Sequence, residues 1–220
     1  MRAALCDEAL RLGRMLVQLL PGESEVQALL ALMELNASRT AARVGNNGEA
    51  VLLPDQDRTL WDGLQIQRGM FALEQARRLG GGAGNYALQA AIVACHMRAR
   101  SAEETDWERI VLLYDALMQT TPSPIVALNR AVAVSMAHGP EAGLEALDAI
   151  TTPAGDTALA GYHLLHSVRG DLLTKMGRFT EAREEIQRAI TMTQNLREQE
   201  LLTERLKQIE KASLSATRCG

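Results

Sequence analysis

The residue types that most often carry out chemistry are sparse in this sequence, with three cysteines and four histidines in 220 residues. Cys95 and His96 are adjacent. Nucleophilic catalysis instead requires a thiol and an imidazole that face each other from different elements, beside an orienting carboxylate. Neighbouring residues on a helix point about 100° apart. We therefore interpret Cys95 as a small apolar residue at a half-buried helix position, and we predict that the chain is not an enzyme.

A second pair, His163 and His166, has the spacing that places two side chains near one helix face, where they could share a metal ion. A third ligand is missing from the pattern, because Asp171 lies too far along the helix to complete a tetrahedral set. We expect one histidine to pack between helices and the other to be solvated. We therefore predict that the chain binds neither a metal ion nor a cofactor.

Acidic residues gather beside an aromatic residue between positions 55 and 62, which suggests either an acid/base pair or a cation site. Asp55 or Asp57, however, immediately precedes a predicted helix. A carboxylate there accepts hydrogen bonds from unpaired backbone N–H groups and complements the helix dipole. We therefore favour a capping role, and we interpret Trp61 and Trp107 as packing anchors between helices.

The glycine-rich segment 80–84 invites comparison with a phosphate-binding loop. It lacks the Lys-Ser/Thr pair that such loops carry, and no strand pattern precedes it. We interpret it as a helix stop followed by a linker.

Asn129 and Arg130 are a polar pair inside an otherwise apolar helical segment. In a repeat register, Asn129 falls on the first helix of a repeat, toward the concave groove where repeat proteins bind peptides. Asparagine and arginine supply directional hydrogen bonds to such ligands. The alternative is a buried hydrogen-bond network between helices. The partner-binding hypothesis comprises Asn129, Arg130, His163, Ser167, Asp171 and Lys175.

Apolar residues recur at helical spacing along nearly the whole chain, with proline and glycine at the breaks. A capping box is expected at Thr105–Glu108. Gly45–Gly48 predicts a hairpin-like excursion or ordered loop near 43–53, and 151–157 predicts a loop. The predicted helices cover the segment before Pro21, and then 23–42, 58–79, 85–99, 106–120, 124–137, 140–150, 158–176, 179–193 and 196–212.

One helical repeat is legible from His163 onward, because glycines and alanines alternate with large apolar residues at tetratricopeptide spacing. Gly170 and Ala182 stand where two antiparallel helices cross closely, Gly177 turns the chain, and Phe179 and Ile186 fill the gap. The predicted fold is therefore all-α: a tetratricopeptide-like helical-repeat solenoid of about ten helices, right-handed and curved.

The predicted organisation is a single helical-repeat domain over residues 1–214 and a tail over 215–220. The repeat signal is weaker over 1–100 and clearer over 105–194. The last helix, within 195–212, begins with Asn195 and Glu198 in capping positions. We interpret it as the cap of the array, with a docking or dimerisation helix as the alternative.

Composition limits the compartments and partners. The chain has 47% hydrophobic and 23% charged residues and a formal net charge of -4, without the basic excess that nucleic-acid binding requires. Charged residues interrupt every apolar stretch, so we expect neither a signal peptide nor a membrane span. Three scattered cysteines indicate a reducing environment. We expect a cytoplasmic location and no direct contact with nucleic acid or membrane.

Several ordered strings are more specific than a generic repeat, among them LLPDQDRTLWD, TDWERIVLLYDAL, SPIVALNRAVAV and YHLLHSVRGDLLTKMGRFTEA. Over about residues 2–205 the sequence resembles the C-terminal extension of a group of extracytoplasmic-function RNA polymerase sigma factors. In that group a tetratricopeptide-like domain follows the two promoter-reading regions. Nothing here matches those regions, so no DNA-binding residue can be transferred, and an excised domain or a truncated reading frame is expected.

The resemblance implies a regulatory domain that modulates transcription initiation through protein contacts. The partners it implies are sigma regions, the RNA polymerase core or an upstream signalling protein. The alternative is a stand-alone helical-repeat scaffold that binds unrelated partners. The sequence gives no indication of the oligomeric state.

Overall fold

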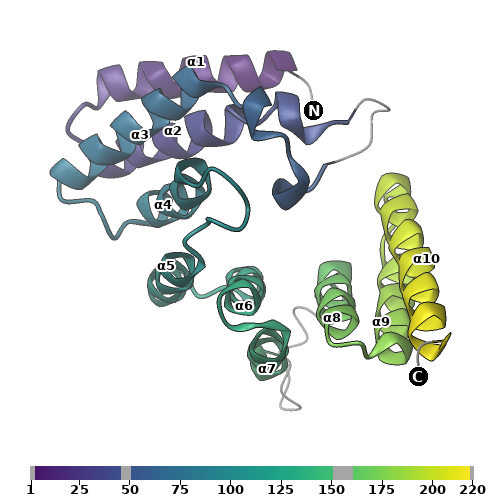
Figure 1. Ribbon diagram of the computed structural model, residues 1–220. Coiled ribbons are helices and arrows are strands. Elements are labelled where there is room, and N and C mark those ends of the chain that lie inside the picture. Colours follow the sequence, from purple (N-terminus) through teal and green to yellow (C-terminus); the bar gives the residue numbers. More distant parts are fainter. Residues whose placement is uncertain (1–2, 46–50, 151–160, 219–220) are drawn as a thin grey trace. The chain divides into compact units, whose positions relative to one another are not determined.

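The computed structural model describes residues 3–45, 51–150 and 161–218 (Figure 1). Within those ranges the fold is all-α and contains no strand. Three short 3₁₀ helices, Ala41–Arg43, Leu53–Asp55 and Arg58–Leu60, connect α2 to α3. The α-helices are α1 (Ala3–Leu19), α2 (Ser24–Ala37), α3 (Gly63–Arg78), α4 (Asn85–Arg98), α5 (Trp107–Thr120), α6 (Pro124–His138), α7 (Pro140–Ile150), α8 (His163–Lys175), α9 (Phe179–Met192) and α10 (Leu196–Arg218).

The helices group into two compact units, residues 1–121 and 122–220, which we call unit 1 and unit 2. The single domain predicted over residues 1–214 stays a prediction. None of the helices in the described ranges combines the length and the apolar character that crossing a bilayer requires.

In unit 1, helix α2 lies at the centre and packs against α1, α3 and α4, while α5 packs on α4 (Figure 1). The contact surfaces are built from alanines, which lets the helix backbones approach closely. Two three-membered clusters join α2, α3 and α4, one of Ala28, Ala76 and Ala87 and one of Ala31, Ala72 and Ala90. The low aromatic content of the sequence, 3%, is consistent with this close packing.

In unit 2, each helix from α6 to α10 packs on the next one along the chain. A single apolar core runs through this stack, and Leu147 and Ile186 are completely buried in it. Burying an aliphatic side chain of this size contributes about 1.5–3 kcal/mol, so the shared core accounts for much of what holds the five helices together.

Two helix pairs of unit 2 cross at a glycine. A Cβ placed on Gly170 of α8 would lie 2.7 Å from Cδ1 of Ile186 in α9. A Cβ placed on Gly143 of α7 would lie 2.9 Å from Cα of Ser135 in α6. Gly177 has a φ of 74°, in the left-handed region that favours glycine, and forms the turn predicted between α8 and α9.

Most helix ends follow the predicted breaks, and the exceptions have local causes. α3 begins at Gly63 rather than near 58, because Asp62 accepts hydrogen bonds from the backbone N–H groups of Leu64 and Gln65. Asp57 caps only the short 3₁₀ helix before it, through Thr59. Asp57 therefore has the capping role that was predicted for Asp55 or Asp57, whereas the cap of the long helix is Asp62, which was expected inside it.

The predicted capping box of α5 is shifted by one residue. The N-cap is Asp106, whose carboxylate accepts from the N–H of Arg109 at 3.0 Å, whereas Thr105 is buried. At the other end of the chain, α10 continues to Arg218, beyond the predicted end at 212. The predicted loop 151–157 lies outside the described residues.

The predicted excursion near 43–53 is described only at its two ends. The backbone N–H of Val51 donates to the carbonyl of Arg43 at 3.0 Å, so the ends lie together. Residues 46–50 lie outside the described ranges.

The close crossing at Gly143 predicts that replacing this helical glycine by alanine destabilises the protein. Alanine normally stabilises a helix interior by about 1 kcal/mol relative to glycine. We expect Gly143→Ala instead to lower the free energy of unfolding by about 1–3 kcal/mol, because the added Cβ meets backbone that cannot rotate away. Urea unfolding followed by far-UV circular dichroism measures this. Gly161→Ala is the control, since a Cβ there meets nothing within 4 Å; equal midpoints for the two variants would show that the crossing is not tight.

Candidate functional site on helix α8

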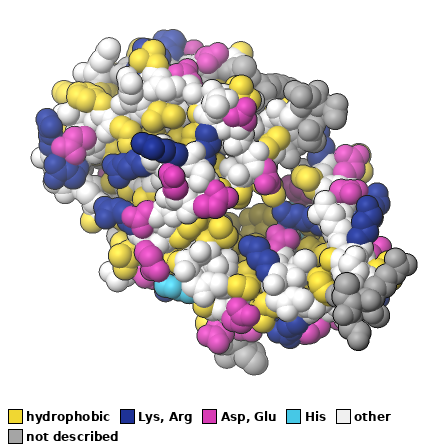
Figure 2. Space-filling view, viewed as in Figure 1, with side chains coloured by type: hydrophobic (Ala, Val, Ile, Leu, Met, Phe, Trp, Pro, Cys, Tyr) yellow, Lys and Arg dark blue, Asp and Glu magenta, His cyan; other side chains and the backbone are white. Residues whose placement is uncertain are grey.

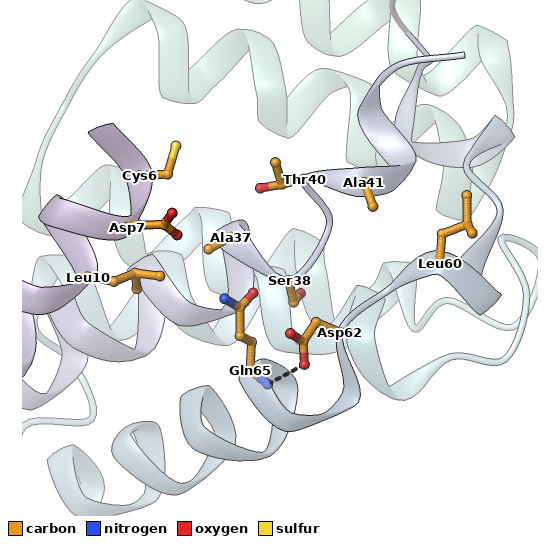
Figure 3. A pocket seen from close by; sticks show the side chains of 10 residues that line it. All are labelled: Cys6, Asp7, Leu10, Ala37, Ser38, Thr40, Ala41, Leu60, Asp62 and Gln65. Carbon is orange, nitrogen blue, oxygen red and sulfur yellow. Dashed lines mark hydrogen bonds between the residues drawn. The ribbon is translucent and has the colours of Figure 1, made fainter. Parts of the chain in front are cut away.

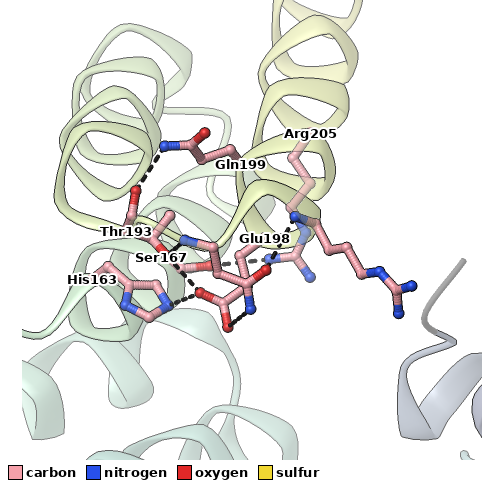
Figure 4. Close-up of polar contacts among 8 residues, drawn as sticks. His163, Ser167, Thr193, Glu198, Gln199 and Arg205 are labelled. Atoms are coloured by element: carbon pink, nitrogen blue, oxygen red, sulfur yellow. Dashed lines mark hydrogen bonds and ion pairs between the residues drawn. The ribbon is translucent and has the colours of Figure 1, made fainter. Parts of the chain in front are cut away.

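Three of the predicted partner-binding residues form a row on α8 that faces α10 (Figure 4). Nε2 of His163 lies 3.0 Å from Oε2 of Glu198, without the geometry of a hydrogen bond. One nitrogen of Arg205, Nη1, donates to Oγ of Ser167 at 3.2 Å and to Oδ2 of Asp171 at 2.8 Å. The row therefore makes contacts inside the chain, where the sequence hypothesis expected an open groove.

The first turn of α10 is held by a second set of polar contacts. Oγ1 of Thr193 donates to Oε2 of Glu198 at 2.6 Å, and Nδ2 of Asn195 donates to Oε1 at 3.2 Å. Oδ1 of Asn195 accepts from the N–H of Arg197, so Asn195 and Glu198 occupy the capping positions that were predicted. Gln199 adds a hydrogen bond to the carbonyl of Thr193 at 2.7 Å (Figure 4).

The charges of this row are partly shielded from water. Burial raises the pKa of the Asp171 carboxyl, and the nearby positive charges of Arg205 and Lys175 oppose that rise. The side chains of Asp171 and Arg205 keep exposed fractions of 42% and 27%. The pair can therefore offer a carboxylate and a guanidinium to the backbone or side chains of a bound peptide.

The two histidines of α8 do not share a ligand. Nδ1 of His166 lies 2.6 Å from Oε2 of Glu185 in α9, whereas His163 faces Glu198. Both side chains are only 18% exposed, so the prediction that one of them is solvated is wrong. Within the described ranges no group of three or more His, Cys, Asp or Glu residues could hold a metal ion.

The other predicted partner-binding residues lie on α6 and at the end of α8. Asn129 is exposed on α6, so it does not belong to a buried network, and Arg130 is half-buried. Lys175 is exposed, and its Nζ lies 4.0 Å from Sδ of Met136 on α6. His163, Ser167 and Asp171 on α8 thus contact α10, whereas Lys175 lies beside α6.

In unit 1, Cys95 and His96 have the surroundings of core residues. Cys95 is 4% exposed, and burial raises the pKa of its thiol, which disfavours the nucleophilic thiolate. Burial, followed by the positive charges of Arg39 and Arg58, lowers the pKa of His96 to about 4. The His96 ring packs edge-on against Trp107, with 5.2 Å between centroids.

Sequence reasoning missed two features of unit 1. One is a cavity of about 300 Å³ between α1, the end of α2 and the start of α3, which Cys6 and Asp62 help to line (Figure 3). Its lining residues come from three separate stretches of the chain, 6–10, 37–41 and 60–65, so no motif indicates it. The other is the contact of Arg39 and Arg43 with Asn36. The spacing of four residues between the two arginines could have indicated that they lie close together.

Comparison with known proteins adds a partial family match. Residues 1–77 match a family of unknown function, DUF6596. The match covers α1, α2 and most of α3.

A longer relative covers more of the chain. The sequence is 48% identical over 196 residues to the uncharacterized protein R00370 of Rhizobium meliloti (strain 1021). The aligned segment covers 89% of this chain and 45% of that protein. The chain therefore spans less than half the length of this relative. No solved structure matches.

Proposed function

We propose that this chain is the regulatory protein-interaction domain of an extracytoplasmic-function sigma factor, and that it modulates transcription initiation through protein contacts. The motif resemblance over about residues 2–205 supports this proposal. A relative more than twice as long as the matched segment is consistent with a domain that works within a larger protein. The proposed partners are sigma regions, the polymerase core or a signalling protein.

We also propose that the helices form tetratricopeptide-like repeats. Three helix pairs, α2/α3, α6/α7 and α8/α9, cross at a glycine, and in unit 2 consecutive helices pack in succession. In each pair the Cβ that the glycine lacks would lie 3.2 Å from an alanine carbonyl: Gly69 and Ala31, Gly143 and Ala131, Gly170 and Ala182. The same small-residue contact thus recurs in both units.

The observation that carries the proposal is the apolar face that α1 leaves open. Leu5, Leu12, Met15 and Leu19 have exposed fractions of 63%, 52%, 44% and 74%. The opposite face, with Leu10 and Gly13, is buried against α2. Hydrophobic side chains also reach the surface among charged ones on the face that Figure 2 shows. Several exposed apolar side chains on one helix face are typical of a surface for protein association.

A direct binding measurement tests the proposal. The purified chain is immobilised, and RNA polymerase core enzyme, with and without an extracytoplasmic-function sigma factor of the same bacterium, is passed over it. We expect saturable binding that Leu12→Glu and Leu19→Glu each weaken at least tenfold, because a charge in an apolar contact loses its hydration. Leu196→Glu on α10 is the matched control, since Leu196 is 73% exposed.

The controls separate the alternatives. Binding that Leu12→Glu and Leu19→Glu leave unchanged would place the contact elsewhere on the chain, and an equal fall in all three variants would show a general effect of the added negative charge. Absence of binding to both polymerase and sigma factor would remove the proposal and favour the stand-alone scaffold.

A further inference from the structure

Two arginines of unit 1 share one neutral acceptor. Arg39 lies just after α2, and its Nη2 donates to Oδ1 of Asn36 at 2.8 Å. Nη2 of Arg43 donates to the same oxygen at 3.2 Å and to the carbonyl of Asn36 at 3.4 Å. One amide therefore holds two guanidinium groups close together, although their positive charges repel each other.

No carboxylate compensates this pair within the described ranges. Arg11 and Arg14 of the same unit each have a carboxylate oxygen at 2.7 Å, whereas neither Arg39 nor Arg43 has one within ion-pair distance. Arginines that are partly withdrawn from water normally have such a partner, because an unpaired buried charge is costly. The two guanidinium groups are thus charged and close together, and none of the residues in the ranges 3–45, 51–150 and 161–218 gives them a carboxylate partner.

Burial adds to the energetic cost of placing these two positive charges together. Arg39 is half-buried, and its Nε is buried without a hydrogen-bond acceptor in the described part of the chain. Burial, together with the charge of Arg43, lowers the pKa of Arg39 to about 10, and the group still stays charged at neutral pH. Each guanidinium presents five N–H donors, and the contacts with the described part of the chain use only one nitrogen of each.

One histidine and one further arginine lie near this pair. His96 lies within electrostatic reach of both Arg39 and Arg58. Arg58 itself is held by the carbonyls of His96 and Ala99, at 2.7 and 2.8 Å, and stacks over Trp61. Glu103 and Glu104 act on Arg58, so its charge is partly balanced. Among the described residues, Arg39 and Arg43 have no carboxylate of this kind beside them.

We infer that Arg39 and Arg43 form a binding site for a small oxyanion of the phosphate class. A planar guanidinium presents parallel N–H donors that match two oxygens of such an anion, and two guanidinium groups would neutralise its charge. The anion would replace the missing counter-ion and provide acceptors for the unused donors. This inference is independent of the proposed sigma-factor function.

Calorimetric titration with inorganic phosphate at pH 7 tests the site in the whole chain. We expect saturable binding at one site per chain. Arg43→Gln should weaken it at least tenfold, and Arg43→Lys, which keeps the charge but not the planar fork, should weaken it by a smaller factor. Arg68→Gln is the control, because Arg68 is an exposed arginine in α3 of the same unit.

The ring of His96 gives a second readout that does not depend on affinity. An anion beside the arginines screens their charge, so NMR titration of the ring should show its pKa rising when phosphate is added and staying unchanged in Arg43→Gln. Sodium chloride at equal ionic strength is the matched salt. An equal response to chloride would overturn the inference and leave only a screened repulsive pair, as would unaltered phosphate binding by Arg43→Gln.

Discussion

Arg14→Met is expected to destabilise unit 1 by about 3 kcal/mol, the lower end of the range for breaking a buried ion pair. Glu34 lies in α2 with its side chain only 2% exposed. Its Oε1 accepts a hydrogen bond from Nε of Arg14 at 2.8 Å and lies 2.7 Å from Nη2 of the same guanidinium. Oε2 of Glu34 is buried without another partner. Removing the guanidinium therefore leaves a buried carboxylate uncompensated, although the 43% exposure of Arg14 lets water screen part of the loss.

Urea unfolding followed by tryptophan fluorescence measures this effect, because both tryptophans, Trp61 and Trp107, lie in unit 1. The matched variant is Arg14→Met combined with Glu34→Leu, which removes both charges and fills the site with apolar atoms. We expect it to recover most of the lost stability. Equal losses in the single and double variants would show that packing of the Arg14 stem, rather than the buried charge, holds α1 on α2.

This ion pair also connects stability to the proposed function. Arg14 joins α1 to α2 beside Gly13, whose missing Cβ would lie 3.2 Å from Sδ of Met33. The exposed leucines of α1 keep a defined orientation only while these contacts hold the opposite face of the helix. A variant that detaches α1 should therefore lose partner binding together with stability, whereas Leu19→Glu should lose partner binding alone.

The helices could be predicted from the sequence because their signals are local. Pro124 and Pro140 stand at the first turns of α6 and α7, where proline is tolerated, and Gly177 stands at the turn before α9. The Gly170 crossing could also be predicted, since it depends on the spacing within a single helix pair.

The candidate site could be predicted only in part, because it depends on where distant segments pack. The repeat register predicted that Ser167, Asp171 and Lys175 line one groove. Arg205 of α10, 34 residues beyond Asp171, instead contacts Ser167 and Asp171, and Lys175 lies beside α6. The cap of α3 shows the same limit at short range. Asp57 and Asp62 are both suitable caps, and tertiary packing decides which of them begins the long helix.

Acidification is expected to weaken unit 1 through His96. In the folded chain its pKa is lowered from 6.5 to about 4, with burial as the largest cause. Between those values the unfolded chain binds the proton and the folded chain does not, so stability falls as the pH falls from 6.5 toward 4. At about 1.4 kcal/mol per pKa unit, the full effect is about 3 kcal/mol and is complete below the folded pKa.

Fluorescence-detected unfolding of the wild type and of His96→Gln at several pH values between 7 and 4 separates this effect from that of other groups. The variant carries no titrating ring, so the difference between the two curves should grow as the pH falls and should level off below the folded pKa. His138→Gln in unit 2 should leave the curve unchanged. Parallel curves for the wild type and His96→Gln would show that the ring takes up its proton without disturbing the fold, which would contradict its burial beside two arginines.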